Sequence, residues 1–394
     1  MSSMERTEQM PPPTAELNGT KLNGGGGDSA PGKYIRWDAE GVEVQQPGEK
    51  EKIQAVSDQF NRFQQMNFDE HHHMYRGTHL KTQGCVYGKI TVRKDLPEHL
   101  AQGMFRSPGT FDCIMRYSSL TPKMLPDTAA APRGVAFKVF NIKGEKIGTV
   151  DDDTQDWTFN NYPLLELRDP KTTNEIADSL ERNWSDADKF VDELKARDDA
   201  DVACYAGGLK QEHMAAMDQY SQSAYRYGDY VAKLGLFPSS QAQKDLKSWY
   251  VKPDDKPNVL STTLRDFHEK NKAVYSLQVQ LLQNLKEQPV DDIGIIWDDK
   301  KYPFEEVATL EFEKQDSFIP AFRVWWDDKI TCNTWHGLKE HTPLGSTNRM
   351  RKVVYAESRK LRMRINATEC VEPRSLKEVP IGNAPIEHMQ ALKV

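Results

Sequence analysis

Cysteine is scarce in this chain of 394 residues, and the few cysteines form no recognisable motif. The five are widely separated: Cys85, Cys113, Cys204, Cys332 and Cys370. Their number is odd and no Cys-x-x-Cys occurs, which argues against both a disulfide framework and a cysteine-based zinc site. This composition suits a protein of a reducing compartment.

The sequence also has no apolar run of the roughly 18 residues that a membrane helix needs, so we expect no membrane span. Residues 1–27 contain no hydrophobic stretch of the signal-peptide type. The last three residues, Leu-Lys-Val, are not a peroxisomal address, and we therefore predict a cytoplasmic protein. The formal net charge of −7 argues against a nucleic-acid binder that works through overall positive charge.

Composition divides the chain into a tail and a folded part. Residues 1–33 include Pro11–Pro13 and Gly24–Gly27, and we predict that they form a disordered N-terminal tail. Residues 34–394 are predicted to form one domain, because 38% hydrophobic residues are enough for a sizeable core. Within it, an amphipathic pattern predicts a helix over residues 49–70.

Short runs with period-two alternation predict strands on both sides of a helical stretch. These runs are residues 86–92, 111–118, 134–140, 275–281 and 308–312. Residues 172–237 are predicted to be a helical insertion, and residues 345–366 to form the last helix. Strands, helices, strands and a helix in this order indicate an α+β protein built on an antiparallel barrel or sandwich.

The last predicted helix carries a stripe of basic and hydroxyl side chains. Arg351, Tyr355, Ser358 and Arg362 stand at i, i+4, i+7 and i+11, which places them on one helix face. Spacing alone favours a solvated basic face, because exposed arginines cost little. The alternative is a tyrosinate that Arg351 stabilises and that binds a cation. Tyrosine is an axial ligand of haem iron in some proteins, and a ferric ion favours the phenolate.

Three other polar patches are weak signals when taken singly. They are Arg76-Gly77-Thr78-His79, Arg116-Tyr117-Ser118 and Asn160-Asn161-Tyr162-Pro163. A lone histidine before a strand is more often structural than catalytic. Adjacent asparagines are common in turns and caps.

In their order along the chain, however, these patches resemble the motifs of the catalase superfamily. That family has Arg-x-x-His, Arg-Phe-Ser, Pro-Arg-Gly, Asn-Asn-x-Pro, Arg-Asp and a final Arg-x-x-x-Tyr-x-x-Thr-x-x-x-Arg-x-x-x-Asn. This chain adds Pro132-Arg133-Gly134, Arg168-Asp169 and Asn366 to the residues above, at the same spacings. The resemblance covers residues 34–170 and 340–366. It implies a catalase-like antiparallel β-barrel with helical additions and a C-terminal helix that carries the proximal haem ligand.

The resemblance also implies roles for individual residues around a ferric haem b. On the distal side, His79 would move a proton between the peroxide oxygens, Asn160 would hold the peroxide, and Ser118 would orient His79. On the proximal side, Tyr355 would bind the iron and Arg351 would stabilise its anionic form. The haem propionates would pair with Arg76, Arg116 and Arg362.

Two departures from the family pattern bear on the reaction. Thr78 precedes His79 where large catalases have an apolar residue, and Tyr117 replaces the phenylalanine of Arg-Phe-Ser. A hydroxyl beside the imidazole could restrain its ring or tautomer, and the same Thr-His pair is known in allene oxide synthase-like members of the superfamily.

We therefore expect a peroxide-dependent haem oxidoreductase that acts on hydrogen peroxide or an organic hydroperoxide, as a homo-oligomer. The alternatives are a biosynthetic haem oxidase or hydroperoxide lyase with a larger organic substrate, and a catalytically idle haem carrier.

Overall fold

A computed structural model describes residues 33–148 and 153–382. The tail predicted for residues 1–33 therefore lies, but for its last residue, outside the described residues. The strands are β1 (Lys81–Val92), β2 (Gly109–Ser119), β3 (Arg133–Val139), β4 (Gln155–Asn160), β5 (Gln219–Tyr220), β6 (Tyr225–Tyr227), β7 (Tyr230–Pro238), β8 (Ala273–Leu281) and β9 (Glu305–Phe312).

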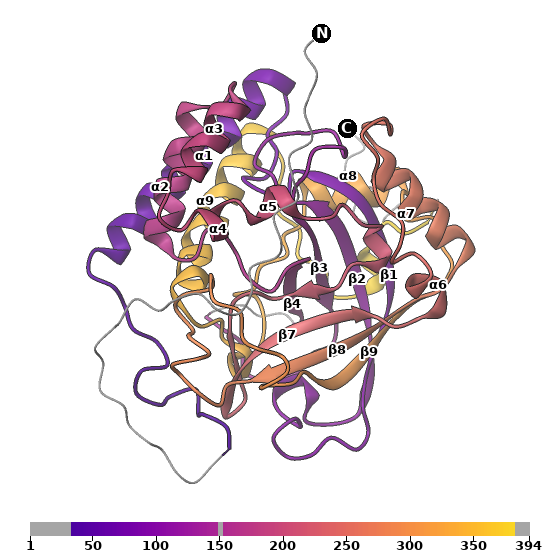
Figure 1. Cartoon of the computed structure of the whole chain (residues 1–394). Helices are drawn as coiled ribbons and strands as arrows, with labels where there is room; N and C mark the ends of the chain where they lie inside the picture. The colour runs from indigo at the N-terminus through magenta and orange to yellow at the C-terminus, as the bar shows by residue number, and fades with distance from the viewer. Residues whose placement is uncertain (1–32, 149–152, 383–394) are drawn as a thin grey trace.

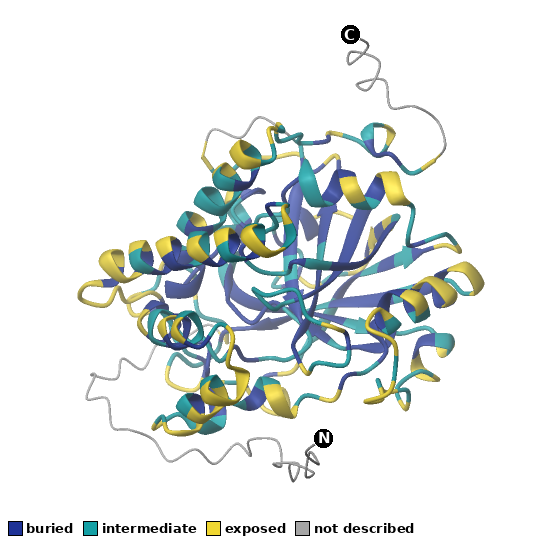
Figure 2. Ribbon diagram, turned by 90° about the horizontal axis from the view of Figure 1, so that it is seen from above, coloured by how far each residue is buried: buried dark blue, intermediate teal, exposed yellow. Residues whose placement is uncertain are grey.

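The described strands form one antiparallel sheet that closes on itself. The strand order is β5-β4-β3-β2-β1-β9-β8-β7-β6, and a further pairing between β5 and β7 joins the two ends. Eight strands therefore make a closed barrel, and β6 extends it beside β7. The main hydrophobic core fills this barrel, and Figure 2 shows its strands almost entirely in the buried colour. The predicted α+β barrel is confirmed.

Helices surround the barrel, and their bounds are as follows. The α-helices are α1 (Glu49–His71), α2 (Pro170–Arg182), α3 (Ala187–Lys195), α4 (Ala200–Ala203), α5 (Tyr205–Gly208), α6 (Gln241–Lys244), α7 (Val259–Lys270), α8 (Pro320–Asp328) and α9 (Ser346–Ile365). The 3₁₀ helices are η1 (Gly103–Phe105), η2 (Met214–Ala216), η3 (Lys339–His341) and η4 (Leu376–Glu378). None of the described helices is long and apolar enough to cross a membrane.

Helices α1, α2, α3 and α9 gather on one side of the barrel (Figure 1). Local chemistry fixes where α2 begins: the carboxylate of Asp169 accepts a hydrogen bond from the backbone N–H of Thr172, and Pro170 occupies the first turn. Gly345 precedes α9 with a φ of 89°, and a side chain there would collide with the carbonyl of Val290. The helix predicted for residues 345–366 is thus present as α9.

The predicted helical insertion at 172–237 is correct only in its first part. Helices α2 to α5 occupy it up to Gly208, but β5, β6 and β7 follow. The spacing of Met214, Met217 and Tyr220 imitates a helical face. Burial alternates along β6 and is almost continuous along β7, and Gly228-Asp229 forms the two-residue turn between them. Gly228 has a φ of 61°, the conformation that such hairpin turns require.

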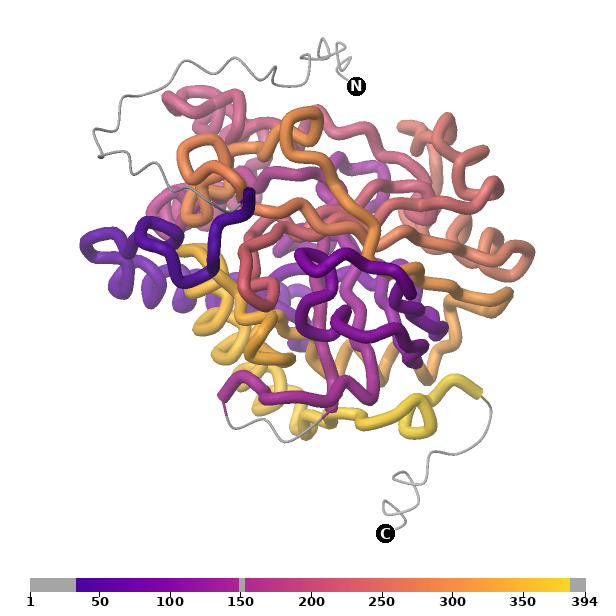
Figure 3. The backbone as a smooth tube through the Cα atoms, turned by 90° about the horizontal axis from the view of Figure 1, so that it is seen from below, coloured from indigo at the N-terminus to yellow at the C-terminus, as the bar shows by residue number. Residues whose placement is uncertain are grey.

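The chain after α9 returns across the barrel, along the lower edge of Figure 3. The backbone N–H of Val371 donates to the carbonyl of Lys329, just after α8. Val379 packs in a second core cluster with Ile114 of β2 and Trp326 of α8. This segment therefore covers an outer face of the barrel beside α8.

Candidate functional site

A cavity of about 700 Å³ lies between strands β2 to β4 and helices α1, α2 and α9. The nine residues predicted to form the site all line this one cavity. They are Arg76, Thr78, His79, Arg116, Ser118, Asn160, Arg351, Tyr355 and Arg362. The structure thus brings together four segments that are up to 286 residues apart (362 − 76). The alternative of a solvated basic face on α9 does not hold for Arg351 and Arg362, which are buried.

His79 stands at the turn before β1 in a strained backbone conformation. Its φ is 53°, in the left-handed region that costs a non-glycine residue roughly 1–3 kcal/mol. Two hydrogen bonds hold it there: its N–H donates to the carbonyl of Leu120 at 3.1 Å, and Arg116 donates to its carbonyl at 2.8 Å. The imidazole Nδ1 lies 2.8 Å from the hydroxyl of Ser118, as the orienting role predicted for that serine requires.

The imidazole of His79 is neutral at physiological pH. Burial, and then the nearby positive charges of Arg116, Arg351 and Arg76, lower its pKa to about 3. A neutral ring has one nitrogen that donates and one that accepts. With Nδ1 engaged by Ser118, Nε2 remains for a proton transfer in the cavity.

Gly134 of β3 makes room for the distal side chains. A Cβ atom there would lie 2.6 Å from Cε1 of His79 and 2.7 Å from Oδ1 of Asn160. It would also lie 2.6 Å from the carbonyl oxygen of Phe159. The imidazole and the amide therefore approach the strand more closely than any residue with a side chain would permit.

The hydroxyl of Thr78 has a different partner from the one that the sequence suggested. It donates to the carbonyl oxygen of Leu120 at 2.5 Å, not to the imidazole of His79. Leu120 also accepts the backbone N–H of His79. Thr78 thus stabilises the turn that carries His79, and it does not set the tautomer of the His79 imidazole directly.

Asn160, at the end of β4, is 6% exposed and uses only one end of its amide. Nδ2 donates to Oε1 of Gln222 at 2.8 Å. Oδ1 has no hydrogen-bond partner. A buried polar atom without a partner is costly, so its presence beside a cavity indicates a place for a ligand.

Three buried guanidiniums meet at another part of the cavity. Burial, together with the charges of Arg362 and Arg116, lowers the pKa of Arg76 well below its usual value, and burial lowers that of Arg362 to about 10. Arg116 pairs with Asp327 at 3.1 Å. Three nitrogen atoms of this cluster have no hydrogen-bond partner among the described residues: Nε of Arg76, and Nε and Nη2 of Arg362.

The charge of this cluster is unbalanced. Three guanidiniums face the carboxylate of Asp327, and the carboxylate of Asp328 also acts on Arg362, so one positive charge remains in excess (3 − 2). Buried charges require partners. The donor set therefore suits a ligand with two carboxylates, or a comparable dianionic group.

Tyr355 of α9 lines the cavity and is half-buried. Arg351, one turn earlier, donates to the hydroxyl of Ser223 at 2.7 Å and to Oδ1 of Asn348 at 3.2 Å. These bonds hold the guanidinium against Ser223 and against the first turn of α9, which contains Asn348. Arg351 also contributes a positive charge to the phenol-bearing face.

Two contacts tie α9 to the segment that carries His79. The hydroxyl of Ser358 accepts the backbone N–H of Gly77 at 3.2 Å. At the end of the helix, Oδ1 of Asn366 accepts the N–H of Met74 at 3.0 Å, and Nδ2 donates to the Met74 carbonyl at 2.9 Å. The spacing of Ser358 and Asn366 thus has a structural reason, since both contact the segment that leads to His79.

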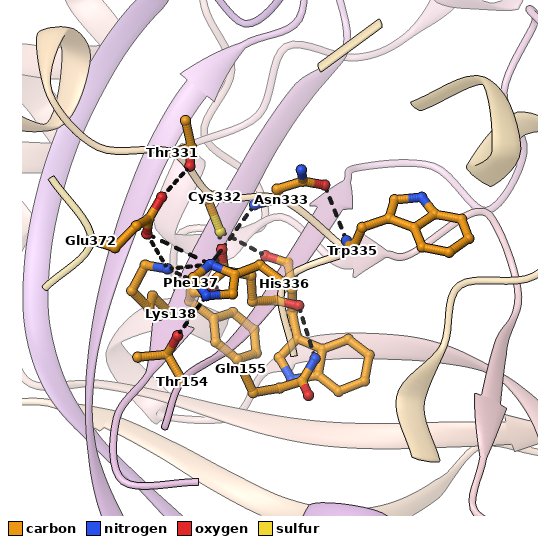
Figure 4. Close-up of polar contacts among 12 residues, drawn as sticks. Phe137, Lys138, Thr154, Gln155, Thr331, Cys332, Asn333, Trp335, His336 and Glu372 are labelled. Carbon is orange, nitrogen blue, oxygen red and sulfur yellow. Dashed lines mark hydrogen bonds and ion pairs between the residues drawn. The ribbon is translucent and has the colours of Figure 1, made fainter. Parts of the chain in front are cut away.

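A buried ion cluster holds the wall formed by residues 331–333 (Figure 4). Nζ of Lys138 lies 2.7 Å from Asp156 and 3.2 Å from Glu372. Glu372 accepts the hydroxyl of Thr331, and Asp156 accepts the N–H of Asn333. The two carboxylates, on β4 and on the segment after α9, raise the pKa of Lys138 despite its burial.

Sequence reasoning assigned no role to Gly134, Gln222, Asp327 or Lys138. Gly134 has a signal, because a glycine between Arg133 and the strand residue Val135 suggests close approach. Gln222 and Asp327 carry no such signal in the sequence, since amides and carboxylates are common in loops and helices.

The overall fold is similar to that of solved catalases, although the sequences have diverged widely. Catalase A from Saccharomyces cerevisiae gives a TM-score of 0.58 at 17% identity, over 82% of this chain and 70% of that chain. A fungal catalase gives 0.56 at 17% identity, over 82% and 68%. A bacterial catalase gives 0.54 at 15% identity, over 77% and 60%. The α+β barrel is therefore catalase-like.

Sequence similarity to curated proteins is limited to one part of the chain. The peroxisomal catalase A of Saccharomyces cerevisiae (strain ATCC 204508 / S288c) is 30% identical over 125 residues. These residues are 30% of this chain but 22% of the yeast protein, so the matched region spans less than a quarter of that relative. No protein-family model matches the chain.

Proposed function

We propose that this protein is a haem-dependent oxidoreductase that reacts with hydrogen peroxide or an organic hydroperoxide. One observation carries the proposal: a single cavity collects a neutral histidine, an amide, a tyrosine on a helix and three buried arginines. The catalase-like fold supports the same assignment. We also propose that residues 34–394 form the haem-binding domain.

The residues present fit a haem. Tyr355 would bind the ferric iron of haem b, and Arg351 would favour its phenolate form. Arg76, Arg116 and Arg362 would hold the two propionates, which would accept from the N–H groups of Arg76 and Arg362 that have no partner among the described residues. When bound, a haem supplies the redox chemistry that protein side chains lack.

The distal residues would supply proton transfer and positioning. Cleavage of an O–O bond requires that a proton move from the inner to the outer oxygen. The neutral His79 can accept that proton at Nε2 and return it, while Ser118 keeps the ring in place. Asn160 would hold the peroxide through its unpartnered oxygen.

A larger organic hydroperoxide is the second candidate substrate, and the cavity lining favours it. Besides the residues named above, apolar side chains of α2 and α3 line the same space, namely Ile176, Ala177, Leu180, Phe190 and Leu194. Pockets with mostly apolar walls and few polar groups are typical of sites for organic ligands. A haem would cover part of these walls. A biosynthetic haem oxidase or hydroperoxide lyase would use the part that a haem leaves free, whereas hydrogen peroxide does not need it.

The experiment compares substrates on the haem-loaded protein. Oxygen release from hydrogen peroxide is measured beside consumption of organic hydroperoxides, with mass spectrometry of the products. His79→Ala should lower turnover roughly 10²- to 10⁴-fold while haem remains bound. A haem-loaded protein that consumes no peroxide of either kind would leave the idle carrier as the better description.

Assembly and location belong to this proposal as well. We infer a homo-oligomer, the state that the resemblance to catalases implies. We infer a cytoplasmic location from the sequence, although the yeast relative is named as peroxisomal.

A further inference from the structure

The amide of Asn160 has a defined orientation, and a second amide determines it. Gln222 lies between β5 and β6, is 1% exposed and has a φ of 61°. Its Nε2 donates to the carbonyl oxygen of Leu164 at 2.5 Å and approaches that of Tyr162 at 3.3 Å. Its Oε1 accepts Nδ2 of Asn160 at 2.8 Å.

Hydrogen-bond chemistry excludes the flipped arrangement. Backbone carbonyls can only accept, so the end of Gln222 that faces Leu164 and Tyr162 must be the NH₂ group. The oxygen of Gln222 must then face Asn160, and the NH₂ group of Asn160 must donate a hydrogen bond to it. Reversing either amide would set two acceptors or two donors against each other in a buried site.

One consequence concerns the atom that remains for a ligand. Oδ1 of Asn160 has no partner and lies on the side of Gly134 and His79, as shown by the position that a Cβ on Gly134 would take. An amide oxygen accepts hydrogen bonds and cannot donate them. The distal amide therefore turns an acceptor to the ligand side, while Gln222 holds one of its two N–H groups.

We propose that Gln222 is a positioning and specificity-determining residue, which turns the oxygen of the distal amide toward the ligand, so that the site favours the O–H group of a neutral hydroperoxide over an anion. The inference rests on the proposed function. It adds that the site selects the protonated form of its substrate, and that the selection originates in a residue that touches Asn160 and not the ligand.

The test uses azide as an anionic probe of the ferric, haem-loaded protein. Its dissociation constant is measured at neutral pH from the change in the Soret band. In Gln222→Met the amide of Asn160 loses its fixed partner and can turn its NH₂ group to the anion. Azide should then bind roughly 3- to 10-fold more tightly, the effect of about one hydrogen bond.

A matched variant separates amide orientation from loosening of the backbone. Gln222→Glu keeps an acceptor for Nδ2 of Asn160 but loses the donors to Leu164 and Tyr162. It should bind azide no more tightly than the wild type. Equal tightening in both variants, or no tightening in Gln222→Met, would overturn the proposal.

Asn160→Ala provides a second test if Gln222→Met does not fold. Because the wild-type amide turns its oxygen to the ligand, this variant should bind azide within about twofold of the wild type, while its KM for hydroperoxide rises. Weaker azide binding in Asn160→Ala would mean that the amide donates to anions, contrary to the proposal. A chain that takes up no haem would refute the proposed function instead, before any azide is added.

Discussion

The side-chain amide of Asn366 makes two hydrogen bonds with the backbone of Met74, one in each direction, at 3.0 and 2.9 Å. This pair joins the end of α9 to the segment that leads to His79. Tyr355 lies eleven residues before Asn366, about 16 Å along a helix. The contact therefore fixes the end of the helix that carries Tyr355 against the segment that leads to His79.

Replacing Asn366 by alanine should weaken both the fold and the site. Two hydrogen bonds would be lost and the backbone groups of Met74 left unpaired, at a cost of about 1–3 kcal/mol in the free energy of unfolding. Urea unfolding measures this cost, and haem affinity should fall in parallel. Asn366→Asp is the control, because it keeps the acceptor for the Met74 N–H and should lose about half as much. Equal losses in both variants would contradict this account.

Gly134→Ala should disturb the distal side chains directly. The new methyl group would meet Cε1 of His79, Oδ1 of Asn160 and the carbonyl of Phe159 at 2.6–2.7 Å. Such overpacking costs about 1–3 kcal/mol, and peroxide turnover should fall at least tenfold. Gly208→Ala is the control, since a Cβ there meets no atom within 4 Å. Unchanged turnover in Gly134→Ala would mean that His79 and Asn160 need not lie so close to β3.

Acid should destabilise the protein from about pH 6.5 downward because of its buried histidines. Burial lowers the pKa of His213 to about 4 and those of His268 and His341 to about 3. Below pH 6.5 these histidines bind protons in the unfolded chain but not in the native state, so the free energy of unfolding falls as the pH falls. At pH 5 each histidine should cost about 2 kcal/mol.

Urea unfolding at pH 7 and pH 5 measures this dependence. His268→Gln should reduce the loss between the two pH values by about 2 kcal/mol. His72→Gln, at an exposed position, should leave it unchanged. A stability that does not change from pH 7 to pH 5 would show that these histidines titrate normally.

Lys138→Met should be among the most damaging substitutions of a single charge. It would remove the cation that lies between the buried Asp156 and the half-buried Glu372, which costs about 3–5 kcal/mol. The exposed pair between Lys339 and Glu145 is the comparison, and Lys339→Met should change stability by less than about 1 kcal/mol. Similar effects of the two variants would contradict the structural role given to the cluster.

The sequence predicted the barrel and the last helix well. In these elements the apolar residues recur with the period of a strand or of a helix, because one face of the element is buried. Strand β8 and helix α9 follow such patterns. The stretch after Glu212 misled the prediction, because Met214, Met217 and Tyr220 have helical spacing by chance. The hairpin of β6 and β7 depends on Gly228, whose positive φ is not evident from the pattern around it.

The motifs in the sequence predicted which residues form the candidate site, but not which partners these residues have. All nine predicted residues line one cavity. Their partners could not be predicted, because hydrogen bonds between distant segments leave no local pattern. Thr78 is the clearest case: adjacency suggested a bond to His79, but its hydroxyl donates to Leu120, 42 residues away.

The visible spectrum of the haem-reconstituted protein, compared between the wild type and Tyr355→Phe, tests the central claim most directly. We predict that the wild type shows the high-spin ferric Soret band of tyrosinate-ligated haem, and that Tyr355→Phe loses it while far-UV circular dichroism stays the same. A wild-type protein that takes up no haem, or a Tyr355→Phe protein with an unaltered Soret band, would contradict the account.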